Sequence, residues 1–308
     1  MKRWLVLVGI VVTGSVVGVW LDPTCVVLGF LRGETFFEGR PTTYWHRALR
    51  SLDPKVQAVA LRDLQDGGAA AVPVLIELVQ LPSGTDWADV EVRCQAADLL
   101  GRLGAEARAA VPALMDALAG PDAHVRAVVA AALTTIGGLP AESIPRWIDL
   151  LESDARLHAT RALSQFGAQA KSAVIPLQNL LKDKDPDVRW NAARTLGKIG
   201  PEAKDAVPAL IATLQDGEAK VREHAAESLG QIGPEAKDAV PALIQVLGDA
   251  DARVRRDAVR SLGQIGAAAK NALPEIRLLL KDSNAKVREA AARALEHIES
   301  ATKIDAAK

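Results

Sequence analysis

Two patterns of apolar positions alternate along most of the chain. The first is V-R-x-x-A-A-x-x-L-G-x-I-G, as in VRWNAARTLGKIG at residues 188–200 and VREHAAESLGQIG at residues 221–233. Its apolar residues fall at i, i+4, i+5, i+8 and i+11, which lie on one stripe of an α-helix. The glycine at its end can adopt the left-handed conformation that caps helices. This pattern therefore predicts an amphipathic helix that ends at the glycine.

The second pattern is V-P-A-L-I, as in VPALIATLQD at residues 207–216. A proline is tolerated in the first turn of a helix, because the amides there have no partner within the helix. The pattern thus predicts the start of a second helix in each unit. Prolines that mark it are Pro73, Pro112, Pro145, Pro176, Pro208, Pro241 and Pro274. The stretch GPEAKDAVPALI occurs at residues 200–211 and again at 233–244, where it would turn the chain from one helix to the next.

The two-helix unit recurs at a nearly constant interval. Ala155-Arg156 replaces Val-Arg in one unit, and Val56-Gln57 begins the series. The other Val-Arg pairs start at Val92, Val125, Val188, Val221, Val254 and Val287. The successive spacings are 36, 33, 30, 33, 33, 33 and 33 residues. A fixed period in this range predicts a solenoid, in which each helix pair buries its apolar face against its neighbours.

The unit D-x-x-V-R-x-x-A-A-x-x-L-G-x-I-G resembles the HEAT repeat, specifically the short bacterial type named after phycobilisome lyases. The resemblance covers residues 43–300, or about eight units. It implies an all-α fold, a right-handed α-solenoid of helix pairs, with the second helix of each pair on the concave side. It does not imply one function, because the family includes scaffolds, lyase subunits and adaptors. The stretch GRPTTYWHRAL also resembles the segment before the repeats in membrane-anchored bacterial HEAT proteins.

The N-terminus predicts a membrane segment. Residues 4–21 carry no charge and would span about 27 Å as a helix, close to the thickness of a hydrocarbon core. Trp4 and Trp20 lie near its ends, and the preceding Lys2 and Arg3 place the N-terminus in the cytoplasm. A cleaved signal peptide is the alternative. In either case the repeats lie outside the cytoplasm.

The remaining boundaries follow from this segment and from the repeats. Residues 22–42 are expected to be an irregular linker, residues 43–300 the solenoid and residues 301–308 a polar tail. Gly14 and Gly18 form a GxxxG spacing in the predicted membrane helix, which would allow two helices to pack closely as a homodimer, but one such spacing in an apolar helix is weak evidence and is better explained by chance or local packing.

Composition argues against several classes of protein. Lys and Arg number 37 against 38 Asp and Glu, and residues 51–150 carry 7 basic and 13 acidic side chains, a net charge of −6. A nucleic-acid partner is therefore not expected, because a continuous basic surface is its usual requirement. Two cysteines, Cys25 and Cys94, are too few for a disulfide framework and lie in no metal-binding motif.

The residue after each valine of the first pattern forms a ladder along the chain. These ladder arginines are Arg93, Arg126, Arg156, Arg189, Arg222, Arg255 and Arg288. An anion-binding stripe is one interpretation. The family resemblance instead implies that each arginine pairs with an aspartate of the adjacent unit and fixes the register of stacking. The candidate partners are Asp89, Asp122, Asp154, Asp185 or Asp187, Asp251 and Asp282.

Candidate chemistry is sparse. Glu223-His224 is similar to the His-Glu pairs with which the HEAT-repeat deoxyhypusine hydroxylases bind two irons, but the order is reversed. Other histidines, His46, His124, His158 and His297, do not complete a facing set. No phosphate loop, HExxH or GxSxG motif occurs. We therefore expect no catalytic, cofactor-binding or metal-binding residues.

The predicted function is a non-enzymatic scaffold that displays a protein-binding surface at a membrane, with a lyase-like enzyme or enzyme subunit as the alternative. Trp190 carries the prediction, because the matching positions hold Glu223, Arg256 and Glu289. An aromatic residue at a solvent-facing site is a common anchor of interfaces. The expected partner-binding residues are Trp190, Leu157, Arg161, Arg194, Val128 and His158. The short spacing before Arg156 should bend the solenoid nearby.

Overall fold

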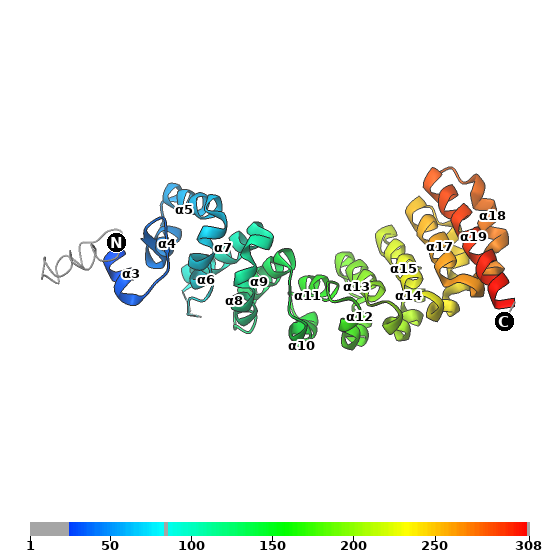
Figure 1. Cartoon of the computed structure of the whole chain (residues 1–308), viewed down its shortest axis with the longest axis horizontal. Coiled ribbons are helices and arrows are strands. Elements are labelled where there is room, and N and C mark those ends of the chain that lie inside the picture. Colours follow the sequence, from blue (N-terminus) through cyan, green and yellow to red (C-terminus); the bar gives the residue numbers. More distant parts are fainter. Residues whose placement is uncertain (1–24, 83–85, 307–308) are drawn as a thin grey trace, which may run out of the picture. The chain divides into compact units, whose positions relative to one another are not determined.

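The computed structural model describes residues 25–82 and 86–306, and the chain there is almost entirely helical (Figure 1). It divides into two compact units, the first ending at Leu139 and the second beginning at Pro140. The family resemblance implied one continuous run of repeats over residues 43–300. Because the structure divides the chain into two units, each unit is described on its own.

The predicted membrane helix at residues 4–21, with Gly14 and Gly18, lies outside the described residues. In the part of the chain that the structure describes, no helix has both the length and the apolar character that a membrane crossing requires.

The first unit begins with a helix and a two-stranded antiparallel hairpin, followed by paired helices. Its α-helices and strands are α3 (Val26–Arg32), β1 (Phe36–Phe37), β2 (Arg40–Pro41), α4 (Thr42–Leu49), α5 (Pro54–Asp66), α6 (Val72–Val79), α7 (Trp87–Leu103), α8 (Val111–Ala117) and α9 (Ala123–Ile136). The 3₁₀ helices η1 (Gly68–Ala71) and η2 (Gly104–Ala110) connect the members of successive pairs.

The second unit repeats one helix pair with little variation. Its α-helices are α10 (Ile144–Asp149), α11 (Arg156–Leu163), α12 (Val174–Leu180), α13 (Pro186–Ile199), α14 (Val207–Thr213), α15 (Ala219–Ile232), α16 (Val240–Gln245), α17 (Ala252–Ile265), α18 (Leu273–Leu278) and α19 (Ala285–Ala306). Its 3₁₀ helices are η3 (Ala141–Ser143), η4 (Leu150–Glu152), η5 (Gly167–Ala173), η6 (Gly200–Ala206), η7 (Gly233–Ala239), η8 (Val246–Gly248), η9 (Gly266–Ala272) and η10 (Leu279–Lys281). Figure 1 shows α13, α15, α17 and α19 in one row, and each packs on the next.

Helix ends follow the local chemistry that the repeat pattern predicts. The Asp185 carboxylate caps α13 by accepting a hydrogen bond from a first-turn amide, and Pro186 occupies the first turn. Gly200 ends α13 with φ 74°, a conformation that costs a side-chain-bearing residue energy. The repeated GPEAKDA stretch is a 3₁₀ helix, η6 or η7, because the positive-φ glycine and the following proline interrupt the α-helical hydrogen bonds.

Small residues set the distance between neighbouring repeats. A Cβ atom added to Gly197 of α13 would lie 2.9 Å from the Cα of Ser228 in α15, so glycine is needed there for the helices to approach. The Ser228 hydroxyl donates to the backbone oxygen of Ala193 at 2.7 Å, and Ser261 of α17 donates in the same way to Ala226. These two buried hydroxyls thus join successive helices of the row, and each finds an acceptor for its own hydrogen.

The ladder arginines connect repeats in the second unit. The Arg222 Nε lies 2.8 Å from Asp249 Oδ2, and its Nη2 lies 2.9 Å from Oδ1. Its Nη1 also donates to the backbone oxygens of Asp216 and Gly217 at 2.8 and 3.1 Å. The same two-pronged pairing, across 27 residues of sequence, joins Arg156 to Asp183, Arg189 to Asp216 and Arg255 to Asp282. Such bidentate pairs fix orientation as well as distance.

Elsewhere the ladder arginines donate to backbone carbonyls. Arg93 donates to Val79 O at 3.1 Å, Arg126 donates to Gly120 O at 2.8 Å and Arg288 donates to Asp282 O at 2.7 Å. The carbonyls of Gly120 and Asp282 lie in the turns just before α9 and α19, so Arg126 and Arg288 each hold the turn that precedes their own helix.

The aspartates that pair with the ladder differ from most of those that the sequence suggested. Of the candidates, Asp282 pairs as expected, whereas the other partners are Asp183, Asp216 and Asp249. Candidates Asp122, Asp185 and Asp251 accept hydrogen bonds from the first-turn amides of their own helices. Asp89 pairs with His46 and Arg50, and Asp187 accepts from the Trp190 indole. The pairing carboxylate lies two residues earlier than the capping one.

The expected irregular linker at residues 22–42 is ordered where the structure describes it. Residues 26–41 form α3 and the β1–β2 hairpin, and Phe37 is buried against Trp45 with ring centroids 5.5 Å apart. The Glu77 carboxylate of α6 accepts hydrogen bonds from Thr35 and Thr42. Buried side chains and these hydrogen bonds fasten the segment to the first repeat.

The C-terminal helix and the unit with the short spacing depart from the regular repeat. The expected polar tail from residue 301 is helical through Ala306, because α19 continues eight residues beyond the 14 of α17. In the unit with the short spacing, α11 has 8 residues and its Ala155 cap offers no side-chain hydrogen bond. The expected bend near this unit stays a prediction.

We predict that Arg222→Ala lowers the free energy of unfolding by about 2–4 kcal/mol at pH 7, because it leaves the Asp249 carboxylate, 8% exposed, without its guanidinium. The hydrogen bond from Arg222 holds the pKa of Asp249 below its usual range. A lowered carboxyl pKa contributes stability above its unfolded value of about 3.9 that is lost as pH falls through the folded value. The gap between variant and parent should therefore shrink below about pH 4.

Urea denaturation of the full chain at several pH values measures this gap. Arg102→Ala is the matched control, because Arg102 is 58% exposed and its pair with Asp98 lies within one helix. An exposed pair contributes about 0–1 kcal/mol. Equal losses for the two variants would contradict the structural role of the ladder.

Candidate functional site

Several exposed polar and charged side chains of the second unit lie on one row of helices. We call the solvent-facing side of α11, α13, α15, α17 and α19 the inner face, because the family resemblance assigns this row to the concave side of the solenoid. Its exposed positions follow the Val-Arg and Ala-Ala pairs of each unit, whereas the alanines and leucines of the same helices are buried. The inner face is thus built on rigid elements at regular intervals.

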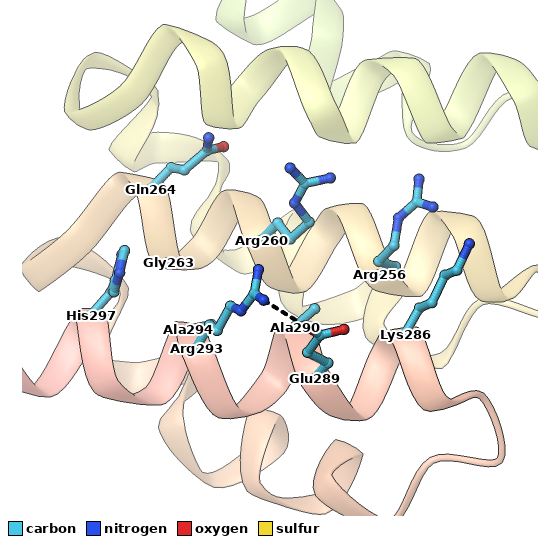
Figure 2. Close-up of a pocket in the computed structure, with 10 residues that line it drawn as sticks. All are labelled: Arg256, Arg260, Gly263, Gln264, Lys286, Glu289, Ala290, Arg293, Ala294 and His297. Atoms are coloured by element: carbon cyan, nitrogen blue, oxygen red, sulfur yellow. Dashed lines mark hydrogen bonds and ion pairs between the residues drawn. The ribbon is translucent and has the colours of Figure 1, made fainter.

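A groove opens on the inner face between α17 and α19, with a volume of about 470 Å³ (Figure 2). In Figure 2 the long side chains of α19 extend toward α17, and those of α17 extend in the same direction. Its lining residues are Arg256, Arg260, Gly263, Gln264, Lys286, Glu289, Ala290, Arg293, Ala294 and His297.

Small residues form the base of this groove. A Cβ atom on Gly263 would lie 3.1 Å from the Cα of Ala294, so the two helices nearly touch there. Ala290 and Ala294 are both buried, at 7% and 4% exposure. Long side chains therefore rise only from the rims, and the base is open to a ligand backbone or a short side chain.

Arg256 is fixed at the rim by carboxylates that lie beneath it. Its Nε and Nη2 donate to Asp257 at 2.9 and 2.6 Å, and its Nη2 lies 3.3 Å from Glu223 of α15. The hydrogen bond to Asp257 raises the pKa of the Arg256 guanidinium above its ordinary value. Because the Asp257 side chain is only 4% exposed, its charge is largely covered by the arginines above it.

The cations of the groove are more exposed than the carboxylates that balance them. Arg260 and Arg293 side chains are 58% and 73% exposed, and Arg293 pairs with Glu289 four residues earlier. Lys286 has no ion pair within residues 25–82 and 86–306. Among the lining residues, four cations face one carboxylate. Weakly buried guanidinium and ammonium groups of one sign make a local positive potential.

The expected anchor, Trp190, is half-buried at the joint between α13 and α15. Its indole stacks on His224 with centroids 5.0 Å apart, and the Lys220 Nζ lies 3.7 Å from the ring centroid. The indole nitrogen donates to Asp187 Oδ1 at 2.7 Å. Trp190 therefore makes contacts with the next repeat, and only part of the ring remains for a partner.

The other expected partner-binding residues are distributed over both units. Arg161 and Arg194 are exposed on α11 and α13 and form no ion pair in the described chain, while Leu157 is half-buried. His158 is half-buried, and burial lowers its pKa, so its imidazole stays neutral near pH 7. Val128 lies on α9 in the first unit and is half-buried. The structure places four of these residues with Trp190 on the inner face of the second unit.

The groove between α17 and α19 is the surface that sequence reasoning missed. The comparison of matching positions had already shown Arg256 and Glu289, but it was used only to single out Trp190. Adding the position after each Ala-Ala pair would have revealed Arg260 and Arg293 beside them. Adding the charges at these two positions, unit by unit, would have indicated the groove.

The described residues offer little for covalent or metal chemistry. Within them, no three His, Cys, Asp or Glu side chains are arranged to hold a metal ion. Burial raises the pKa of the Cys94 thiol to about 11, so it is not a thiolate at neutral pH. The inner face instead presents charged side chains on a stiff framework, an arrangement suited to binding.

Comparison with known families gives matches over much of the chain. A family model of HEAT repeats matches residues 144–218, 177–241 and 240–308, which together exceed half of the chain. A model of the PBS lyase HEAT-like repeat matches residues 92–120. No curated protein matches the sequence.

Solved structures of Kap121p and Kap95p share the fold at low identity. Kap121p bound to Nup53p is 16% identical, with a TM-score of 0.57 over 86% of this chain, which spans about a third (33%) of the length of Kap121p. Kap95p, in a structure that describes its binding to RanGDP, is 15% identical with a TM-score of 0.54 over 84% of this chain and 40% of its own. The CpcE–CpcF phycocyanin lyase complex from Nostoc sp. PCC7120 is 24% identical with a TM-score of 0.41, over 50% of this chain and 99% of its own.

We predict that Trp190→Ala lowers the free energy of unfolding by about 1–2 kcal/mol, because the His224 stack and the Lys220 contact are lost. Trp190→Phe is the control, since a phenyl ring keeps most of the stacking and loses only the hydrogen bond to Asp187. Thermal and urea unfolding of both variants measure the difference. An unchanged stability of Trp190→Ala would show that the indole is free to serve as a binding anchor.

Proposed function

The chain belongs to the HEAT-repeat family, and from this premise we propose that it is a non-enzymatic scaffold that binds another protein on the concave face of its repeats. The observation that carries the proposal is the inner face of the second unit. There, exposed Arg161, Arg194 and Arg260 stand on helices whose spacing is fixed by buried hydroxyls and by the arginine ladder. A stiff framework of helices loses little freedom on binding, which favours affinity.

The relatives in the structural comparison support this proposal by their fold. Kap121p has been seen bound to Nup53p and to the extreme C-terminus of the phosphatase Cdc14p. A solenoid suits such partners, because its stacked repeats present a long surface to an extended segment.

The alternative proposal is a lyase-like enzyme or enzyme subunit. Catalytic sites usually bring an acid, a base or a nucleophile together in a sheltered pocket. The groove between α17 and α19 is open instead, and its long side chains are mostly cations. This arrangement favours the binding of a partner over the transformation of a substrate.

A cross-linking experiment tests the scaffold. A photoreactive amino acid replaces Arg194 on the inner face or, as the control, Lys204 on η6, both of which are exposed. We expect discrete adducts with one protein from position 194 and few from position 204, after irradiation of cells that produce the full chain. Equal adducts from both positions, or none from 194, would count against the scaffold.

We also propose that residues 4–21 anchor the chain in a membrane with the repeats outside the cytoplasm. The support is the uncharged stretch with Lys2 and Arg3 before it. Alkaline phosphatase fused after Lys308 should be active in intact cells, and the protein should stay with the membrane fraction after carbonate washing. Activity of a reporter that works only in the cytoplasm would reverse the orientation, and release by carbonate would favour a cleaved signal.

A further inference from the structure

The groove between α17 and α19 differs from the rest of the inner face in its charge. The neighbouring α15 carries Glu223 and Glu227 at its outward positions, whereas α17 carries Arg256 and Arg260 at the matching ones. Four cations and one carboxylate line the groove, while Glu223 and Asp257, outside the lining, pair with Arg256.

We propose that this groove binds an acidic, extended peptide segment of a partner protein, with carboxylates seated between the cations of the two helices. The inference rests on the proposed scaffold function and specifies the chemistry of one part of the partner. Lys286 and Arg293 of α19 extend toward α17, Arg256 and Arg260 of α17 extend in the same direction, and all four line the groove (Figure 2). Carboxylates of an extended chain alternate from side to side, so one segment can reach both rims.

Arg256 is prepared for this role before any ligand arrives. Asp257 holds two of its nitrogens, and Glu223 lies against one of them, so the guanidinium has little freedom to lose on binding. Asp257 is buried beneath Arg256 and also lies 3.4 Å from Arg260. One covered carboxylate therefore orders two arginines toward the groove without presenting its own charge to the ligand.

The remaining cations are held loosely and are ready to exchange partners. Arg293 pairs with Glu289 on the same helix, and both side chains are more than 60% exposed. Such exposed pairs are weak, so a ligand carboxylate can compete for the guanidinium. Lys286 lies seven residues, about two turns, before Arg293 and has no ion pair to break among the described residues.

The dimensions and the lining favour a peptide over a nucleic acid. His297 has the one aromatic ring among the lining residues, so a strand of several bases would find no row of rings on which to stack. Gly263 and Ala290 at the base leave room for a peptide backbone. About 470 Å³ holds a few side chains, whereas a nucleic-acid backbone needs a longer basic track.

A binding experiment with the full-length chain tests the proposal. The probe is a fluorescent octaglutamate peptide, and the comparison probes are octaglutamine and oligothymidine, all at the same ionic strength. The test variant is Lys286→Glu with Arg293→Glu. The control is Lys204→Glu with Lys237→Glu, which reverses the same number of exposed charges on η6 and η7.

We expect octaglutamate to bind the parent, octaglutamine to bind much more weakly, and the groove variant to lose about tenfold or more in affinity for octaglutamate. The control variant should lose less than about threefold, because its charges lie outside the groove. Circular dichroism and thermal melts establish that both variants are folded. If the groove variant is unfolded, Lys286→Gln with Arg293→Gln takes its place, and a smaller loss in the same direction is expected.

Three outcomes would overturn the proposal: no binding of octaglutamate by the parent, equal losses in the groove and control variants, or tighter binding of oligothymidine that the groove variant abolishes. None of these outcomes changes the adducts expected from position 194, which lies on α13 outside the groove. Loss of those adducts with intact octaglutamate binding would instead remove the scaffold function and leave the groove as a binding site. The two proposals therefore fail separately.

Discussion

The guanidinium of each ladder arginine in the middle of the second unit joins three segments of chain, and the stacking of the repeats depends on it. Arg222 starts from α15, closes the preceding turn through the carbonyl of Asp216 and reaches Asp249 in the turn of the next repeat. Asp249 in turn accepts the amide of Asp251 and so shapes the entry into α17. Geometry passes from one repeat to the next because each turn is held by two arginines, its own and that of the preceding repeat.

Because the ladder arginines stabilise the stacking of the repeats, the side chains of the inner face are not needed for that role. Ladder arginines lie near the starts of the helices and are largely buried, at 14–17% exposure for Arg189, Arg222 and Arg255. Residues after them, such as Arg256 and Glu289, point to the inner face and vary from unit to unit. The fold can therefore keep one set of charges constant for stacking and change another set for binding.

Most of the fold could be predicted because the residues that start and end the helices recur from repeat to repeat. The glycine ends, the proline starts and the spacing of the valines each recur, and they place α13, α15 and α17 correctly. The ladder aspartates were assigned less well. A pattern centred on the helix directs attention to the capping Asp185 or Asp251, and the pairing residue two positions earlier belongs to the turn. The regular structure of residues 26–41 was not predicted, because it depends on hydrogen bonds to Glu77, which lies far away in the sequence.

The candidate site shows why a single unusual residue is a poor guide in a solenoid. Trp190 differs from its equivalents in sequence, yet its surroundings are set by His224, one repeat further along, which covers the indole. Arg256 looks ordinary in sequence, yet Glu223, one repeat earlier, and its neighbour Asp257 hold it in place. On such a surface the neighbours of a residue lie about one period away, at 33 positions for Arg256 and Glu223. Inner-face chemistry is therefore set by equivalent positions in successive repeats, and the groove between α17 and α19 takes its cations from two of these repeats.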